Sequence, residues 1–290
     1  MTVSDKKVIE PENNKIFVNG INLNYFDWGG DGPVMVLLHG SHGSTSFGRM
    51  WDFTARLLHP DYRILALDQR GFGDSDKPQT GYASEDYAAD LAAFVDALGI
   101  APFILVGKSM GGRVAQTYGG LYPDKVSHIV LVNGPHYVSL FSDPEAAERF
   151  RKGSEAMRVP QTTFPSEDEA IKQLSDRYAE RGGETVLRHD LKYNTNRKPD
   201  GRLEWKYDNN ARAESHYHIP DNLTSYVKRI TCPVLFAVAE NNQDMSGERL
   251  HHAESLFSNV VSVKIANSSH DPQTENPVET ARVIREFLAK

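Results

Sequence analysis

Short apolar runs alternate with longer stretches of helical character along most of this 290-residue chain. Most of the runs are continuously apolar, which is typical of strands buried on both faces of a parallel sheet. Strands that alternate with helices predict a doubly wound, mostly parallel α/β sheet. The expected strands are Val34–Leu38, Ile64–Leu67, Phe103–Val106, Ile129–Val132, Val234–Ala239 and Val260–Ile265. The expected helices are Phe47–Leu58, Ser84–Leu98, Met110–Tyr122, Gly247–Phe257 and Pro277–Leu288.

The N-terminal part of the pattern predicts a hairpin instead. Two runs, Lys15–Val18 and Ile21–Trp28, flank the pair Asn19-Gly20, which is a strong signal for a two-residue turn.

The alternation fails between Gly134 and about Arg229, where no buried strand is expected. We interpret this segment as amphipathic helices, such as Asp143–Met157 and Ser166–Arg181, followed by a polar loop over Asn194–Asn210. A gap of this length is too long for an ordinary loop. The sequence therefore predicts a core formed by residues 1–134 and 230–290. Residues 135–229 are expected to form a helical cap over the carboxyl ends of the strands, where open α/β sheets bind ligands.

Composition narrows the choice of partner and location. The net charge is −7 and the basic residues are scattered, whereas a nucleic-acid surface needs a basic stripe. The first residues lack the apolar core of a signal peptide. No stretch approaches the ~20 apolar residues of a membrane span. We expect a cytoplasmic protein with a small-molecule substrate, and no nucleic-acid or membrane partner. Nothing in the pattern indicates an oligomeric state.

The segment Gly107–Gly111, which reads Gly-Lys-Ser-Met-Gly, carries the strongest chemical signal. It follows the expected strand Phe103–Val106 and opens a helix. A sharp strand-to-helix turn imposes strained backbone angles on the central residue and exposes its side chain. The helix N-terminus also offers backbone N–H groups and partial positive charge to a developing oxyanion. Ser109 is therefore the expected nucleophile.

From about Lys15 to Lys290 the sequence resembles the α/β-hydrolase superfamily, in its serine-nucleophile branch with a helical cap. Besides Gly107–Gly111, the matching segments are His39-Gly40-Ser41, Asp68–Ser75 and Tyr122–Val126. The resemblance implies an oxyanion hole built from the backbone N–H groups of Ser41 and Met110, with His39 supporting the loop. As substrate-binding residues we expect His42, Tyr137 and Trp205.

The chain order of this fold, nucleophile then acid then histidine, places the base late in the sequence. His270, before the final helix, is the expected base. The two positions that usually supply the acid read Asn133 and Asn242. Asp244, two residues beyond the second position, is the favoured acid. Glu240, or an enzyme that uses Asn133 or Asn242 without a charged third member, remains an alternative.

These residues predict a serine hydrolase of small carbonyl substrates: an ester, a lactone, an amide or a carbon–carbon bond beside a ketone. Related enzymes with an aspartate nucleophile, the dehalogenases and epoxide hydrolases, are disfavoured because Ser109 replaces that residue. Water completes the cycle, so no cofactor is expected. No metal is expected either, because His216 and His218 are not accompanied by a carboxylate cluster and instead indicate a pocket lining or a solvated surface. Two alternatives remain: a cofactor-free lyase or dioxygenase-type enzyme on this fold, and a non-catalytic receptor for a small ligand.

Overall fold

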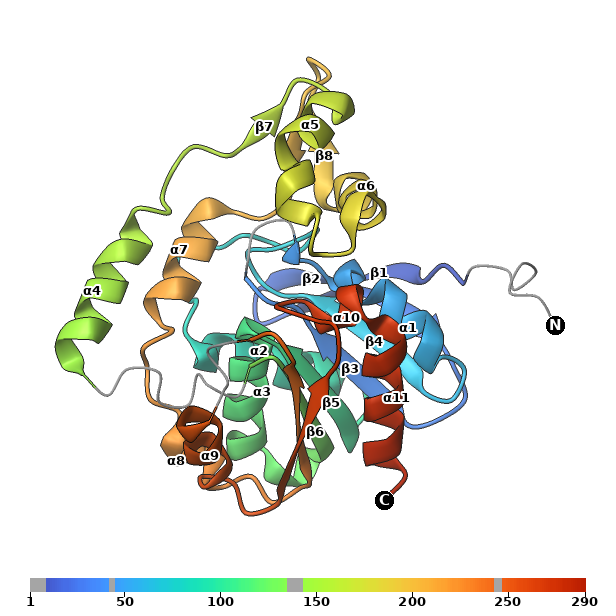
Figure 1. The fold of residues 1–290 in the computed structure, drawn as a ribbon, viewed down its shortest axis with the longest axis vertical. Coiled ribbons are helices and arrows are strands. Elements are labelled where there is room, and N and C mark those ends of the chain that lie inside the picture. Colours follow the sequence, from blue (N-terminus) through green and yellow to red (C-terminus); the bar gives the residue numbers. More distant parts are fainter. Residues whose placement is uncertain (1–8, 42–44, 135–142, 243–246) are drawn as a thin grey trace.

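An eight-stranded sheet forms the centre of the molecule (Figure 1) in the computed structural model, which describes residues 9–41, 45–134, 143–242 and 247–290. The strand order is β1-β2-β4-β3-β5-β6-β10-β11. The strands are β1 Glu12–Val18, β2 Ile21–Gly29, β3 Val34–Leu38, β4 Arg63–Asp68, β5 Phe103–Lys108, β6 Val126–Val132, β10 Val234–Ala239 and β11 Val260–Ile265. β2 runs antiparallel to both β1 and β4, and the remaining neighbours are parallel. Each predicted apolar run is a strand, which confirms the mostly parallel α/β sheet.

The predicted hairpin is also present. β1 and β2 pair with Val18 opposite Ile21. Asn19 and Gly20 between them have φ values of 50° and 78°. A two-residue turn with both central residues at positive φ matches the twist of the strands that it joins.

Helices cover both faces of the sheet. α2 and α3 pack on one another over one apolar cluster, and α1 and α11 pack on one another over a second. The core helices are α1 Asp52–Leu58, α2 Ser84–Leu98, α3 Met110–Leu121, α9 Glu248–Glu254, α10 Pro272–Glu275 and α11 Pro277–Leu288. α1 is shorter than predicted, because Gly48–Trp51 forms a 3-10 turn before it. The two-sided arrangement confirms the doubly wound fold.

The segment after β6 is partly helical, as predicted, but it also contains a small sheet. Its helices are α4 Pro144–Glu155, α5 Glu167–Tyr178, α6 Gly183–Asn194, α7 Asn209–Tyr217 and α8 Thr224–Val227. The small antiparallel sheet consists of β7 Thr163–Phe164, β9 Leu203–Trp205 and β8 Thr195–Arg197. In the view of Figure 1 most of these elements lie above or beside the core sheet.

The polar loop predicted over Asn194–Asn210 is therefore wrong in part. β8 and β9 form a hairpin, in which the Lys198 N–H donates to the Arg202 carbonyl at 2.8 Å. The residues between these two include Pro199, Asp200 and Gly201, and Gly201 has a φ of 86°. Pro-Asp-Gly is a turn signal with a physical basis, so the hairpin had a marker that the polar composition obscured.

Contacts between backbone and side chains join this segment to the core. The Asp208 N–H donates to the Gly71 carbonyl at 3.0 Å, and the Arg113 guanidinium of α3 donates to the carbonyls of His218 and Ile219, both at 3.0 Å. Within the four described ranges, no helix is both long and apolar enough to cross a membrane.

Candidate functional site

Ser109 lies in a strained turn between β5 and α3. Its φ of 51° and ψ of −113° are rare for a residue other than glycine. Close packing explains the glycines on either side. A Cβ at Gly107 would lie 2.2 Å from the Gly111 carbonyl oxygen, and a Cβ at Gly111 would lie 2.5 Å from the Leu38 carbonyl oxygen. The turn therefore needs glycine at both positions.

The start of α3 leaves one backbone donor beside Ser109. The N–H groups of Gly112 and Arg113 both donate to the Ser109 carbonyl, at 2.9 and 3.2 Å. Met110 is the first residue of α3, so the helix itself supplies no acceptor for its N–H. In the part of the chain that the structure describes, this N–H makes no hydrogen bond. It is available to an oxyanion.

The loop after β3 passes directly beside Ser109. The Gly111 N–H donates to the His39 carbonyl at 3.1 Å. A Cβ at Gly40 would lie 3.2 Å from the Ser109 Cβ. Ser41, the next residue, is buried. The two predicted oxyanion residues, Ser41 and Met110, therefore come from the two segments that enclose Ser109.

His39 supports this loop and is fully buried. Its Nδ1 lies 2.7 Å from the Gly40 carbonyl oxygen, and its Nε2 accepts the Gln69 N–H at 2.9 Å. Those partners require the tautomer with hydrogen on Nδ1. Burial lowers the pKa of His39 to about 4, so the ring is neutral near pH 7. With both nitrogens engaged, His39 has a structural role.

A second buried side chain, that of Asp68, organises the Asp68–Ser75 segment. The Asp68 carboxylate accepts the N–H groups of Gly48 at 2.6 Å and Asp74 at 2.9 Å, and the side chain of Asn24 at 3.0 Å. Burial raises the pKa of Asp68 to about 6. Gly73 has a φ of 53° and passes so close that a Cβ there would lie 2.2 Å from this carboxyl group. Asp68 therefore organises the loop through hydrogen bonds.

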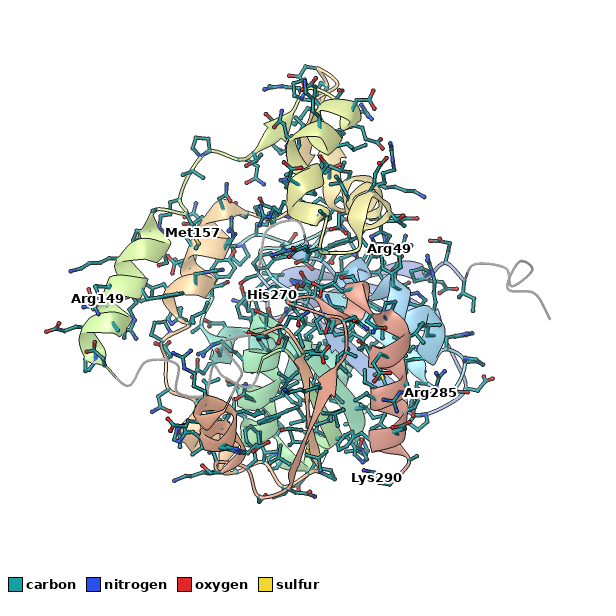
Figure 2. The ribbon with its side chains drawn as sticks, viewed as in Figure 1. Arg49, Arg149, Met157, His270, Arg285 and Lys290 are labelled. Carbon is teal, nitrogen blue, oxygen red and sulfur yellow. The ribbon has the colours of Figure 1, made fainter. Side chains whose placement is uncertain are left out.

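The topology brings the predicted nucleophile and the predicted base to one edge of the sheet. β5, β6, β10 and β11 are parallel neighbours, so their carboxyl ends share that edge. Ser109 follows β5, Asn133 follows β6, Asn242 comes after β10 and His270 comes after β11. Figure 2 shows His270 near the middle of the molecule, between the core helices and the inserted segment.

The loop that carries His270 is held by Glu275 from α10. The Glu275 carboxylate accepts the backbone N–H groups of Ser269, His270 (3.2 Å) and Asp271 (2.9 Å), and the Ser269 hydroxyl at 3.0 Å. On the other side, the Asn133 amide donates to the His270 carbonyl at 3.1 Å. One carboxylate and one amide thus hold the backbone around His270.

A buried ion pair links the residues next to the predicted nucleophile and the predicted base. Lys108 precedes Ser109 and Asp271 follows His270, and their charged groups lie 2.7 Å apart with side-chain exposures of 0% and 1%. Burial alone would raise the pKa of Asp271, but the charge of Lys108 holds it well below its usual range. The Arg181 guanidinium, just after α5, lies 3.6 Å from the other carboxylate oxygen of Asp271. The pair joins the two loops and reaches the inserted segment.

The two usual acid positions hold paired amides. The Asn242 side chain donates to the Asn133 side-chain oxygen at 2.6 Å. Glu240 is exposed, and its carboxylate accepts the Asn267 N–H at 3.0 Å. Asp244, the favoured acid, lies outside the described residues. The identity of the acid therefore stays a prediction.

Trp205 lies inside the inserted segment. Its ring is buried, nearly perpendicular to Phe164 with centroids 5.8 Å apart and stacked on Tyr207 at 6.3 Å. His42 and Tyr137, the other expected substrate-binding residues, lie outside the described residues.

Four charged residues that the structure places around the predicted site had no role assigned from the sequence. These are Lys108, Asp271, Glu275 and Arg212, and the structure adds His216, which the sequence indicated as a pocket lining or part of a solvated surface. The i, i+4 spacing of Arg212 and His216 would have predicted a shared helix face. The contact between Lys108 and Asp271 had no sequence signal, because 162 positions separate them (271 − 108 − 1).

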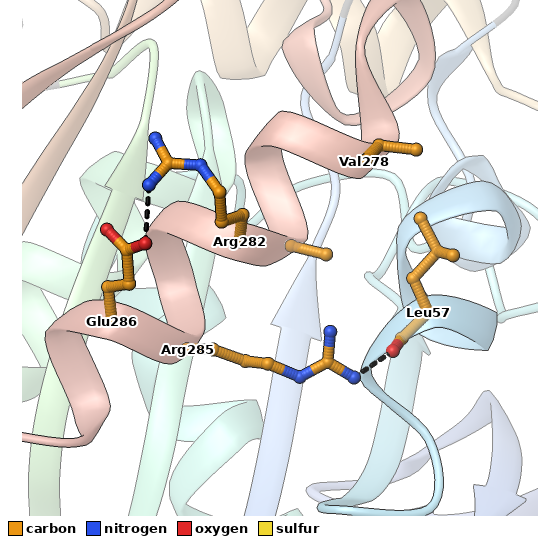
Figure 3. Close-up of a pocket in the computed structure, with 6 residues that line it drawn as sticks. Leu57, Val278, Arg282, Arg285 and Glu286 are labelled. Atoms are coloured by element: carbon orange, nitrogen blue, oxygen red, sulfur yellow. Dashed lines mark hydrogen bonds and ion pairs between the residues drawn. The ribbon is translucent and has the colours of Figure 1, made fainter.

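A surface hollow lies apart from this site, between α1 and α11. In Figure 3 Arg285 reaches across it to the Leu57 carbonyl, while Arg282 turns toward Glu286. None of its lining residues belongs to the predicted site. Over the described ranges, no cluster of three or more His, Cys, Asp or Glu side chains has the arrangement of a metal site.

Comparisons with known proteins agree with this architecture. The family model described as alpha/beta hydrolase fold matches residues 33–277. The chain is 27% identical to 2-(acetamidomethylene)succinate hydrolase of Mesorhizobium japonicum, over 94% of each protein. A crystal structure of E-2-(acetamidomethylene)succinate hydrolase superposes with a TM-score of 0.82 at 25% identity, covering 97% of this chain and all of the other. Epoxide hydrolase 4 of Mus musculus is 32% identical over 54% of this chain and 45% of its own length. The chain belongs to the alpha/beta hydrolase fold family and is a hydrolase of that fold.

Proposed function

We propose that this chain is a serine hydrolase of a small carbonyl substrate: an ester, a lactone, an amide or a carbon–carbon bond next to a ketone. The observation that carries the proposal is the backbone of Ser109, held at φ 51° and ψ −113° at the end of β5. Strain of this kind persists where the surrounding structure enforces it, and in this fold it presents the nucleophile.

In the proposed reaction, His270 removes the proton of the Ser109 hydroxyl as its oxygen attacks the carbonyl carbon. The N–H groups of Met110 and Ser41 stabilise the oxyanion that forms. His270 then donates the proton to the leaving group, and water hydrolyses the acyl-enzyme by the reverse sequence. The nucleophile, the base and the oxyanion donors all come from the chain itself.

The third member of the arrangement is proposed to be Asp244, which would hold the His270 ring and stabilise its protonated form. If Asp244 is the acid, Asp244→Asn lowers turnover by orders of magnitude, as loss of a triad acid does. Glu240→Gln is the matched variant for the alternative acid, whose carboxylate accepts a hydrogen bond from the Asn267 backbone N–H. An unchanged turnover in Asp244→Asn assigns the role to Glu240 or to the pair Asn133 and Asn242.

Residues 135–229 are proposed to act as a cap that selects a small substrate, with His42, Tyr137 and Trp205 in contact with it. The name of the Mesorhizobium japonicum relative denotes cleavage of a small, carbonyl-containing compound. That similarity supports the substrate size and the carbonyl chemistry.

A fluorophosphonate probe tests the nucleophile. The wild-type protein should be labelled, Ser109→Ala should not, and Ser255→Ala should be labelled like the wild type. Ser255 is a suitable control because its hydroxyl bonds the His252 carbonyl on an exposed part of the chain. Full labelling of Ser109→Ala would exclude Ser109 as the nucleophile.

A cofactor-free lyase or dioxygenase-type reaction is the second candidate. The observation that favours it is the amide pair Asn133 and Asn242 at the positions that usually carry the acid. An amide stabilises a protonated imidazole less than a carboxylate does, so chemistry less demanding than ester cleavage becomes feasible. Turnover that needs His270 but survives Ser109→Ala would identify this reaction.

A further inference from the structure

Helix α7 carries a guanidinium that has no acidic partner in the described part of the chain. The Nε of Arg212 is buried and makes no hydrogen bond, and Arg212 forms no ion pair with any carboxylate of the residues that the structure describes. The nearby carboxylates have other partners. Glu214, two residues on, pairs with Arg158 at 2.5 Å, and Asp208 caps α7 by accepting the Ala211 N–H at 2.8 Å. Arg212 as a whole is half-buried, and withdrawing a cation from water is costly unless a counter-charge or hydrogen bonds accompany it.

The surroundings of Arg212 increase this cost. Burial lowers the pKa of Arg212, and the like charge of Arg177 on α5 lowers it further, while Tyr207 opposes the shift. The Arg212 guanidinium lies 5.8 Å from the centroid of the Tyr207 ring. An anion between the two guanidinium groups would relieve their repulsion and accept hydrogen bonds from Arg212.

His216 connects this position with the oxyanion loop. It lies one helical turn beyond Arg212, a spacing that puts both side chains on one face about 5–6 Å apart at Cβ. The Ser41 backbone carbonyl faces the His216 ring, and the Phe150 ring stacks on it at 6.5 Å. Both ring nitrogens are buried without a well-formed hydrogen bond in the described ranges. Burial lowers the pKa of His216 to about 4, so it is neutral near pH 7.

This chain of contacts relates Arg212 to the reacting carbonyl. The N–H of Ser41 is the proposed oxyanion donor, so a substrate carbonyl bound there lies beside His216. Arg212 lies one turn further along the same face of α7. A substrate that extends from Ser41 along this face therefore meets a neutral imidazole first and then a guanidinium.

We propose that Arg212 binds a carboxylate of the substrate, with Arg177 adding positive charge and His216 lining the path to Ser41. The inference rests on the proposed function and names its substrate class: small esters, lactones or amides that carry a carboxylate separated by a short linker from the carbonyl that Ser109 attacks. A guanidinium suits this role because its planar fork donates two parallel hydrogen bonds to a carboxylate.

Kinetics with two matched esters test the substrate class. One is 4-nitrophenyl hydrogen succinate, which carries a free carboxylate, and the other is its neutral methyl ester. The wild type should have the higher kcat/KM for the anionic ester. In Arg212→Gln the ratio of the two kcat/KM values should fall by about ten- to hundred-fold, the loss expected for a hydrogen-bonded charge, mainly through KM. Arg212→Lys keeps the charge without the planar fork, so its ratio should lie between those of the wild type and Arg212→Gln.

Arg158→Gln is the matched control, because it removes an arginine whose partner, Glu214, lies on α7, the helix that carries Arg212. Its ratio should equal that of the wild type. A wild type without preference for the anionic ester, or an Arg212→Gln variant with an unchanged ratio, overturns the proposal.

Binding without turnover separates this proposal from the hydrolytic one. Succinate should raise the Tm of the wild type and of Ser109→Ala, but not that of Arg212→Gln, and dimethyl succinate should not raise that of Ser109→Ala, which cannot hydrolyse it to a carboxylate. An equal shift in Arg212→Gln overturns the carboxylate site. If succinate acts as expected while Ser109 resists fluorophosphonate, the carboxylate site stands and the proposed hydrolysis fails.

Discussion

The turn around Ser109 and the loop around His270 meet at the same sheet edge but are built differently. At Ser109, backbone packs on backbone: the space for a Cβ at Gly107 or Gly111 is already filled by carbonyl groups. At His270, side chains from elsewhere hold the backbone: Glu275 from α10 and Asn133 from the end of β6. The first region depends on the absence of a Cβ at Gly107 and Gly111. The second depends on the hydrogen bonds that the side chains of Glu275 and Asn133 accept and donate.

This difference predicts how each region should respond to a substitution. Adding one methyl group to the turn creates a steric conflict that backbone atoms cannot avoid. Changing one side chain at the His270 loop removes hydrogen bonds but leaves room for the backbone to remain. The Lys108–Asp271 ion pair belongs to both regions, so its loss should affect both at once.

The largest effect is expected from breaking that pair. Lys108→Met leaves Asp271 buried without its main counter-charge, which should lower the free energy of unfolding by about 3–5 kcal/mol. The double variant Lys108→Met/Asp271→Leu removes both charges and should recover part of that loss. Urea unfolding of the single and double variants measures both values. A single variant within experimental error of the wild type would show that the pair does not link the two regions.

Gly111→Ala tests the backbone-built turn. Its Cβ would lie 2.5 Å from the Leu38 carbonyl oxygen, so we expect a loss of about 3 kcal/mol, together with slower labelling of Ser109. Gly153→Ala is the control, since Gly153 lies within α4 with open space around it. There alanine should stabilise the protein by about 0.5–1 kcal/mol. Equal behaviour of the two variants in urea would contradict the steric account.

The pH dependence of the free energy of unfolding tests His39, the side chain that supports the loop beside the backbone-built turn. Its pKa in the folded protein is about 4, below the ordinary value of 6.5, so the unfolded chain binds more protons between these values. Its contribution is therefore complete above pH 6.5 and is lost as pH falls toward 4. From pH 7 to pH 5 the wild type should lose about 2 kcal/mol relative to His39→Gln. A constant difference between the two proteins over this range would refute the neutral, buried histidine.

The smallest effect is expected at the His270 loop. Glu275→Gln weakens the hydrogen bonds to three backbone N–H groups and should lower the free energy of unfolding by about 1–2 kcal/mol. Labelling of Ser109 should slow by about ten-fold, less than the 100-fold that a 1 Å displacement of a catalytic group costs. Its pH profile should also shift, which a purely structural loss would not cause. Glu279→Gln, at an exposed pair with Arg282, should change neither quantity.

The alternation of apolar runs and helical stretches predicted the strands of the central sheet. It succeeded best for the inner strands, because strands buried on both faces leave a continuous apolar signature that needs no knowledge of their partners, whereas the edge strand β11 is largely exposed or half-buried. The hairpin of β8 and β9 escaped prediction because its short strands are largely polar, and only Pro199-Asp200-Gly201 marked the turn. The third member of the site stays open for a different reason: neither Asn133 nor Asn242 carries the expected charge, and Asp244 is supported by sequence position alone.

Local rules thus determined the elements and the position of Ser109, because a strand-to-helix turn with close-packed glycines is specified within five consecutive residues. Only the tertiary structure decided which distant side chains meet. It paired Lys108 with Asp271, placed Glu275 against the His270 loop and, among the residues that the structure describes, left Arg212 without an acid. These contacts join positions that no periodicity relates. The energy of a buried charge depends on what lies around it in space, and sequence spacing does not encode those surroundings.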